Sequence, residues 1–291
     1  MLMENPMHDL IQTLEVVYVP FVVLLSLIVG SFLNVVIHRL PKMMESEWQR
    51  EASELLNVPP PTDEKITLSS PSSSCPRCNR AIRWYENIPV LSYLFILRAH
   101  CAGCHSFIPL RYPIVEVLSA LIGWFVAVHF GFSLQMLAFL ILSYGLIALV
   151  FIDVDHQLLP DQITLPLLWL GLIVHLLLGA VPLDHAVLGA AIGYLLLWSV
   201  FWLFKLLTGK EGMGYGDFKL LAALGAWGGF TVLPGILLIS SVLGVFYALV
   251  STLMVKRDLN TAIPFGPFLA LAGWVMLIWG QSLNHWYLSL L

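Results

Sequence analysis

Charged residues are scarce in this chain of 291 residues: Asp, Glu, Lys and Arg together make up 11% of it, whereas 59% of the residues are hydrophobic. About a quarter of the residues of a soluble domain are charged, so this composition excludes an ordinary soluble domain. The first 38 residues contain no Lys or Arg. Because no basic segment and no small-residue cleavage site precede the first apolar run, we expect a retained membrane helix there, not a removable signal peptide.

Several catalytic signatures are also absent. The chain has no His-Glu-x-x-His and no Gly-x-Ser-x-Gly motif, and residues 209–211 (GKE) lack the flanking residues of a phosphate-binding loop. These absences argue against a zinc metalloprotease, a serine hydrolase and a P-loop NTPase. The net charge of -4 gives no reason to expect nucleic acid as a partner.

Long apolar runs dominate what is present. Windows free of Asp, Glu, Lys and Arg cover residues 16–37, 117–152, 162–183, 185–204, 220–255 and 259–291. About 20 residues cross the hydrocarbon core, so the two longest windows must each hold more than one helix. Glycine-containing turns at 131–133 and 228–231 divide them. The sequence therefore predicts an all-α, polytopic membrane protein with about eight transmembrane helices.

The basic residues indicate the orientation of these helices, because Lys and Arg are retained on the cytoplasmic side. Eight helices threaded from an amino terminus outside the cytoplasm place four segments inside it: 41–111, 153–161, 205–219 and 256–263. All fourteen Lys and Arg residues lie in or beside those segments. We therefore predict that the amino terminus lies outside and that membrane lipids surround the helices.

All four cysteines lie in the one sizeable polar segment, residues 41–111, as two Cys-x-x-Cys pairs: Cys75, Cys78, Cys101 and Cys104. Two such turns can close a tetrahedron of thiolates around one Zn²⁺. Four thiolates leave no open position on the metal, so we predict a structural zinc ion in a zinc-ribbon-like insertion.

The sequence also allows other chemical states of these cysteines. Disulfides are disfavoured in a cytoplasmic segment, where thiols are kept reduced. Redox-active or unliganded thiols are a further alternative. His100 and His105 flank the second pair and could replace one cysteine ligand.

Asp153, in FIDVDH at residues 151–156, and Asp217, in GYGD at residues 214–217, lie where apolar runs meet polar turns. A carboxylate at the edge of a membrane is costly and commonly marks a function. Both fall at the cytoplasmic ends of predicted helices, a common depth that a pair of catalytic aspartates requires. Two carboxylates sharing one site can act as acid and base on a peptide bond.

Alternatives to catalysis remain for the aspartates. They could cap helix ends, bind a divalent metal through Asp153 and Asp155, or relay protons. We expect Asp155 and Asp161 to orient the Asp153 segment or cap the next helix, and Glu116 to belong to an ion pair or polar network. The run PFGP at residues 264–267 cannot form a regular helix and could line a substrate groove.

Taken together, these motifs resemble the bacterial type IV prepilin peptidases, membrane aspartyl proteases of the Gly-x-Gly-Asp type. The resemblance rests on GSFLNVVIHRLP at 30–41, the cysteine pairs, ENIP at 86–89, RYP at 111–113, the Asp153 motif, GYGD and PFGP. It implies three parts: a first helix in residues 1–40, a zinc-binding, methyltransferase-associated insertion in 41–111, and a transmembrane protease domain in 112–291.

The resemblance further implies an inner-membrane enzyme, with a periplasmic amino terminus, that cleaves type IV prepilins and type II secretion pseudopilins after glycine. Asp153 and Asp217 would be the catalytic pair. The enzyme would then methylate the new amino terminus with S-adenosylmethionine, for which Asn34, Glu86, Asn87 and Arg111 are candidate binding residues. The alternative from another class is a non-enzymatic assembly factor of the pilus or secretion machine that binds its partners through the zinc module.

Overall fold

The computed structural model describes residues 6–59, 66–210, 212–255 and 263–288. Throughout these ranges the regular structure is helical, and they contain no β-strand. The chain divides into two compact units, residues 1–148 and residues 149–291. The predicted all-α class is therefore confirmed.

The described ranges contain eight α-helices. They are α1 (Pro6–Leu56), α2 (Arg111–Phe130), α3 (Leu134–His156), α4 (Asp161–Leu178), α5 (Leu183–Thr208), α6 (Tyr215–Gly228), α7 (Leu233–Val255) and α8 (Gly266–Leu288), joined in places by the short turns η1 (Trp84–Asn87), η2 (Ser92–Ile96) and η3 (Phe230–Val232).

Six stretches among the described residues are long and apolar enough to cross a membrane: those in α1 to α5 and the segment 230–254, which includes α7. The 14 residues of α6 fall short, because a helix of that length spans only about 21 Å of a hydrocarbon core about 30 Å thick. In α8, the apolar stretch Gly266–Gly280 is also shorter. A multi-pass membrane protein fits this set of helices.

In the first unit, α1 is longer than the sequence predicted. The sequence predicts a first helix in residues 1–40, but α1 continues through Pro41 to Leu56, for 51 residues in all. Met, Glu, Gln, Arg, Ala and Leu are strong helix formers and fill most of residues 43–56, so the helix resumes its hydrogen bonding beyond the proline. At about 1.5 Å per residue, α1 far exceeds the thickness of a membrane.

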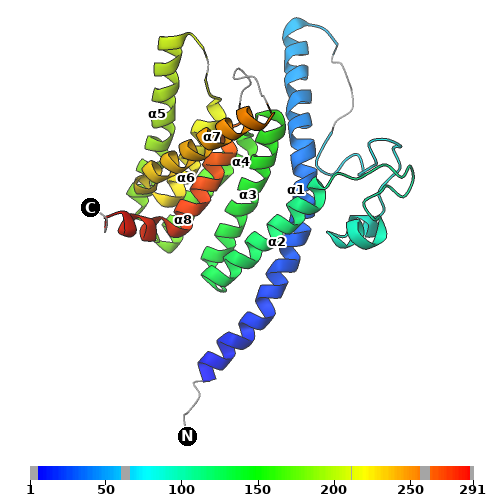
Figure 1. The fold of residues 1–291 in the computed structure, drawn as a ribbon, viewed down its shortest axis with the longest axis horizontal. Helices are drawn as coiled ribbons and strands as arrows, with labels where there is room; N and C mark the ends of the chain where they lie inside the picture. Colours follow the sequence, from blue (N-terminus) through cyan, green and yellow to red (C-terminus); the bar gives the residue numbers. More distant parts are fainter. Residues whose placement is uncertain (1–5, 60–65, 211, 256–262, 289–291) are drawn as a thin grey trace. The chain divides into compact units, whose positions relative to one another are not determined.

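Small residues let α1 and α2 lie close together in Figure 1. A Cβ atom at Gly30 of α1 would come within 2.8 Å of the Cα atom of Glu116 in α2. The Ser26 hydroxyl of α1 also lies 2.7 Å from the hydroxyl of Tyr144 in α3, so α1 contacts both helices. Close backbone packing and polar contacts stabilise helix pairs in lipid. The packing of α1 against α2 therefore holds the two ends of the insertion that connects them.

In the second unit, the short helix α6 packs against α4, α5 and α8 (Figure 1). Almost every residue from Asp217 to Trp227 is buried. The contact with α5 is closest at Gly189 and Gly225, where a Cβ atom on either glycine would overlap the backbone of the other helix. Because α6 is enclosed in this way, Asp217 in its first turn is also removed from solvent.

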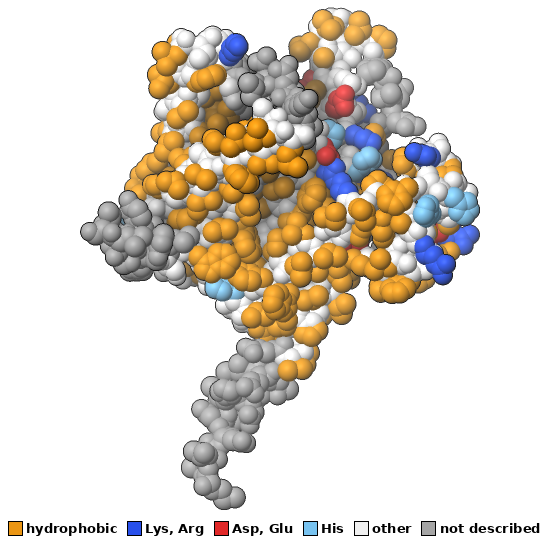
Figure 2. All heavy atoms as spheres, in the orientation of Figure 1, with side chains coloured by type: hydrophobic (Ala, Val, Ile, Leu, Met, Phe, Trp, Pro, Cys, Tyr) orange, Lys and Arg blue, Asp and Glu red, His pale blue; other side chains and the backbone are white. Residues whose placement is uncertain are grey.

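The surface of the molecule matches a membrane environment. Figure 2 shows apolar side chains over much of the helical surface, with Lys, Arg and His gathered mainly around the segment between α1 and α2. On α7, for example, Leu238, Val245 and Leu253 are each about two-thirds exposed or more. Such a broad apolar surface is unfavourable in water and favourable in lipid.

Candidate active site and cysteine cluster

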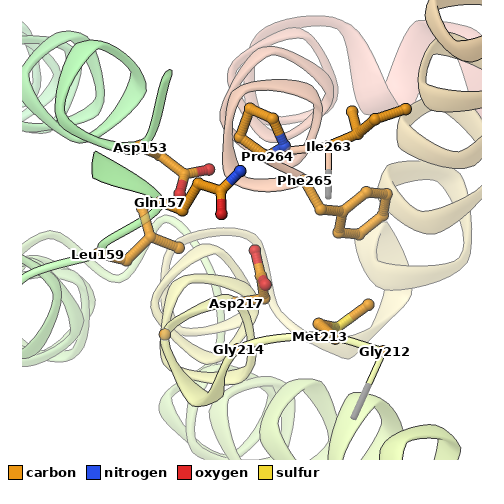
Figure 3. Close-up of a pocket in the computed structure, with 11 residues that line it drawn as sticks. Asp153, Gln157, Leu159, Gly212, Met213, Gly214, Asp217, Ile263, Pro264 and Phe265 are labelled. Carbon is orange, nitrogen blue, oxygen red and sulfur yellow. The ribbon is translucent and has the colours of Figure 1, made fainter. Parts of the chain in front are cut away.

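A cavity of about 320 Å³ in the second unit contains both predicted aspartates (Figure 3). Asp153 comes from the last turns of α3 and Asp217 from the first turn of α6, and their side chains are 5% and 7% exposed. The other lining residues are Gln157, Leu159, Gly212, Met213, Gly214, Gly216, Ile263, Pro264 and Phe265. Residues 64 positions apart in the sequence thus meet in one pocket.

Asp153 is oriented by the chain just before α8. Its Oδ2 atom accepts a hydrogen bond of 3.0 Å from the backbone N–H of Gly266. A Cβ atom at Gly266 would lie only 2.6 Å from that same oxygen. Only glycine therefore lets the backbone approach the carboxylate so closely.

Asp217 is held differently. Its backbone N–H donates to the carbonyl of Gly214 at 3.3 Å, at the start of α6. Its Oδ1 atom is buried and has no hydrogen-bond partner among the described residues. Buried polar atoms are almost always paired, so an atom of this kind marks a position for water or a ligand group.

The structure distinguishes the remaining acidic residues that the sequence singled out. Asp155 is exposed and does not line the cavity. Asp161 begins α4, where both of its carboxylate oxygens accept hydrogen bonds of 2.7 Å from Lys219. In the first unit, the buried Glu116 accepts a 2.8 Å hydrogen bond from the backbone N–H of Val90, as expected for a polar network.

Some lining residues carried no signal in the sequence. Gln157 reaches the cavity because it adopts a left-handed conformation (φ 54°) directly after α3. Leu159, Met213 and Ile263 belong to no recognisable motif, and only their nearness to the motifs could have suggested them. Pro264 and Phe265 line the cavity, as expected for part of the run 264–267, whereas Gly266 and Pro267 already belong to the start of α8.

The four cysteines form a compact cluster in the first unit. Their sulfur atoms all lie within 4.8 Å of one another, an arrangement that could hold a metal ion. The two closest pairs, Cys75 with Cys104 and Cys78 with Cys101, are separated by 3.8 and 3.9 Å. A disulfide would need about 2.05 Å, and all four cysteines are free.

Each cysteine pair sits in the same kind of turn. The N–H groups of Asn79 and His105 donate to the carbonyls of Cys75 and Cys101, both at 2.9 Å. Both of these residues have positive φ angles, 55° and 53°. His105 thus has a backbone role that matches that of Asn79, and the cluster of possible metal ligands contains cysteines alone.

Hydrogen bonds favour the thiolate form of two of the cysteines, Cys75 and Cys104. At Cys78 the backbone of Arg80 lowers the pKa, but desolvation and the neighbouring thiols outweigh it and raise the pKa to about 11. Backbone N–H groups of Cys78 and Arg77 lower the pKa of the Cys75 thiol to about 6. Hydrogen bonds from Ser106, first from its hydroxyl, lower the pKa of Cys104 as well. The thiolate is the form that binds a metal, so the donor set suits a thiophilic cation such as Zn²⁺.

Glu86, Asn34 and Arg111, three of the four candidate residues for binding S-adenosylmethionine, already interact within the protein. Glu86 is buried; its carboxylate accepts hydrogen bonds from Arg80 (2.7 Å) and from the backbone of Arg83 (2.8 Å), which lower its pKa. Asn34 donates to the carbonyl of Tyr112 at 3.1 Å. Asn87 is exposed and Arg111 is partly exposed.

Comparisons with known proteins extend over both units. A family model described as "Bacterial Peptidase A24 N-terminal domain" matches residues 24–130, and one described as "Type IV leader peptidase family" matches residues 140–249. No solved structure matches the chain.

Several similar proteins carry the name prepilin leader peptidase/N-methyltransferase. The one from Pseudomonas aeruginosa is 52% identical over 98% of this chain and 98% of its own length. Those from Stutzerimonas stutzeri and Neisseria gonorrhoeae are 55% and 48% identical, over 91% and 92% of this chain and 92% and 94% of their own lengths. Likeness at this level over nearly the whole length leaves one assignment: the chain belongs to the type IV leader peptidase family.

Proposed function

We propose that the chain removes the leader peptide of type IV prepilins and type II secretion pseudopilins, cleaving after a glycine, and then methylates the new amino terminus. Its relatives are named for both activities. The observation that carries the peptidase assignment is the cavity shared by Asp153 and Asp217. We assign these two residues as the catalytic pair.

Two carboxylates in one cavity supply an acid and a base. One is ionised and takes a proton from water, whose oxygen then adds to the carbonyl carbon of the cleaved bond. The other is protonated and donates a hydrogen bond to the carbonyl oxygen. A proton then passes to the leaving amine as the C–N bond breaks, and a carboxyl group and a free amino terminus result.

The glycines next to Asp217 favour a peptide as the ligand. Gly212, Gly214 and Gly216 all line the cavity, and none has a side chain to obstruct an extended backbone. A basic leader would remain in the cytoplasm by the same charge rule that orients the enzyme. We therefore propose an inner-membrane location with the amino terminus in the periplasm and both aspartates near the cytoplasmic face.

Two other functions fit the site less well. Binding of a divalent metal by the Asp-x-Asp motif would require Asp153 and Asp155 to face one site, but only Asp153 lines the cavity. Among the described residues, the four cysteines are the only group of three or more potential metal ligands. A non-enzymatic assembly factor would have no use for two buried carboxylates on one cavity, because burying them is costly.

We also propose that Cys75, Cys78, Cys101 and Cys104 hold one structural Zn²⁺. The four sulfurs occupy all positions of a tetrahedral ion, so the metal would supply folding energy and not chemistry. The segment has little apolar core of its own: its cysteines Cys75 and Cys101 are among its few buried residues.

S-adenosylmethionine as methyl donor is proposed from the names of the relatives. Two of the residues suggested for it, Glu86 and Asn34, already form hydrogen bonds within the protein. We therefore derive no step of methyl transfer from this chain's side chains.

The test combines purified protein with a prepilin and S-adenosylmethionine, and the product is weighed by mass spectrometry. We expect loss of the leader and gain of one methyl group. Asp153→Asn or Asp217→Asn should lower leader removal by about 10³-fold or more, because each removes an acid–base group. Asp184→Asn, which changes an exposed carboxylate at the start of α5, is the matched control and should cleave normally. Normal cleavage by either active-site variant, or no cleavage by the unaltered chain, would refute the proposal.

A further inference from the structure

A second hollow of about 300 Å³ lies beside the aspartate cavity, between α7 and the start of α8. We call it the α7–α8 groove. Its walls are mostly apolar: Gly244, Val245 and Ala248 from α7, and Ile263, Phe265 and Phe268 from the other side, with Ser241 of α7 as the polar lining residue. The groove has no charged side chain among its lining residues, in contrast to the aspartate cavity.

The groove and the aspartate cavity share a wall. Ile263 and Phe265 line both of them. In Figure 3 their side chains extend away from Asp153, whereas the two carboxylates face the cavity. The two hollows are therefore neighbouring parts of one binding region with different chemistry.

The shared wall is fixed relative to the carboxylates. Phe265 directly precedes Gly266, whose N–H donates to Asp153 Oδ2 at 3.0 Å. A peptide advances about 3.3 Å per residue when extended. If a peptide bond of a substrate lies at the carboxylates, the side chain of the adjacent substrate residue can therefore reach Phe265.

Gly244 gives the groove its depth. A Cβ atom placed there would lie 3.6 Å from the ring of Phe268 and 3.8 Å from the ring of Phe265. A methyl group would fit at that distance, but any larger side chain would fill the space between the two rings. Glycine at this position leaves room for an apolar group of another molecule.

We propose that the α7–α8 groove is a specificity subsite that binds an apolar side chain of the substrate next to the cleaved bond. The inference rests on the proposed leader-peptidase function, in which glycine precedes that bond, so the nearest side chain belongs to the residue that follows it. A lipid chain is the competing occupant on an apolar membrane surface. The wall shared with the catalytic cavity favours the substrate, because a lipid site would need no such connection.

The test compares kcat/KM on prepilins that carry Phe, Leu or Ala immediately after the cleaved bond. Gly244→Leu should lower kcat/KM at least about tenfold for the Phe substrate and much less for the Ala substrate, because the added side chain takes the space of the substrate's. Val242→Phe is the control. It adds bulk to an exposed position of α7 outside the groove, and it should behave as the unaltered chain does.

The outcomes separate the two proposals. If the unaltered chain cleaves no prepilin, the proposed function fails and this inference fails with it. If the unaltered chain cleaves and Gly244→Leu stays active but lowers kcat/KM equally for all substrates, or for none of them, the subsite alone is refuted, and lipid is left as the occupant. If Gly244→Leu is inactive on every substrate, Phe268→Ala decides: a wider groove should favour Trp over Phe after the cleaved bond, and an unchanged preference would refute the subsite.

Discussion

Asp153 and Asp217 line one cavity, but one carboxylate oxygen of Asp217 has no hydrogen-bond partner among the described residues. Asp153 Oδ2 is fixed by the N–H of Gly266, whereas Asp217 Oδ1 is buried without a partner among the described residues. The first arrangement orients a group before the substrate arrives. The second leaves a position toward which a water or a peptide carbonyl can be directed.

A substitution at Gly266 tests how closely Asp153 must be positioned. In Gly266→Ala the new Cβ atom would lie 2.6 Å from Asp153 Oδ2 and 3.1 Å from Leu159, so the carboxylate has to move. We expect kcat to fall about 100-fold, the usual effect of displacing a reacting group by about 1 Å. The measurement is leader removal at saturating prepilin.

Gly280→Ala is the control for the same change in the same helix, because its Cβ atom would meet the flexible end of Met276 at 3.3 Å and the side chain of Val232 at an ordinary contact distance of 3.6 Å. It should retain activity. Undiminished turnover by Gly266→Ala would show that the hydrogen bond to Asp153 does not position the catalytic group.

At this scale the sequence predicts the two aspartates but not their contacts. Both motifs stand out because carboxylates are rare at the edges of apolar runs. The choice between Asp153 and Asp155 depends on how α3 is rotated, which the apolar pattern around it does not define. The role of Gly266 depends on a hydrogen bond between residues 113 positions apart, and no local pattern encodes such a contact.

At the scale of elements, the first turn of α6 is held against the turn between α3 and α4. A Cβ atom at Gly216 would come within 2.7 Å of the Leu159 side chain. Two residues after Asp217, Lys219 donates to both carboxylate oxygens of Asp161 at 2.7 Å. These contacts join the segments that carry the two aspartates, and they fix how far apart the carboxylates lie.

Lys219 is therefore a positioning residue. We expect Lys219→Met to lower kcat about tenfold with little change in KM, because neither Lys219 nor Asp161 lines the cavity. Exposed ion pairs contribute only about 0–1 kcal/mol to stability, so the variant should stay folded. Steady-state kinetics on a prepilin provide the two constants.

Two comparisons make this prediction specific. Exchanging the charges, with Asp161→Lys and Lys219→Asp together, should recover most of the lost kcat. Lys210→Met, which changes an exposed lysine just before the glycine-rich segment, should have no effect. A loss of kcat that the charge exchange does not recover would count against a role for the ion pair.

The elements also show where sequence periodicity is informative. Apolar windows predict eight helices because each charge and turn signal interrupts a run, and the structure has eight α-helices in its described ranges. The apolar windows could not show that α1 continues past Pro41, because a proline after an apolar run normally predicts the end of a helix. Nor could they show that α6 is too short to span, because the run from 220 to 255 has no charge at the break.

At the scale of the whole molecule, the two candidate sites belong to different units. The cysteine cluster lies in residues 1–148 and the aspartate cavity in residues 149–291. Each unit has its own packed helices, α1 with α2 in the first and α6 with α4, α5 and α8 in the second. Loss of one site should therefore leave the packing around the other intact.

Removing the metal tests this independence. If Zn²⁺ supplies the folding energy of the insertion, stripping it with a strong chelator should open residues 66–110 to a protease, while α4, α5, α6 and α8 stay protected. Cys75→Ser and Cys101→Ser should have the same effect without a chelator, since each removes a buried ligand. Limited proteolysis with peptide mapping by mass spectrometry locates the cuts, and metal analysis of the untreated protein should find about one zinc per chain.

The control is exchange into a buffer that contains no Mg²⁺ and no chelator of Zn²⁺. This treatment should leave both regions protected. An insertion that resists the protease after the metal is gone would mean that its own contacts, such as the ion pair of Arg80 with Glu86, are enough to fold it.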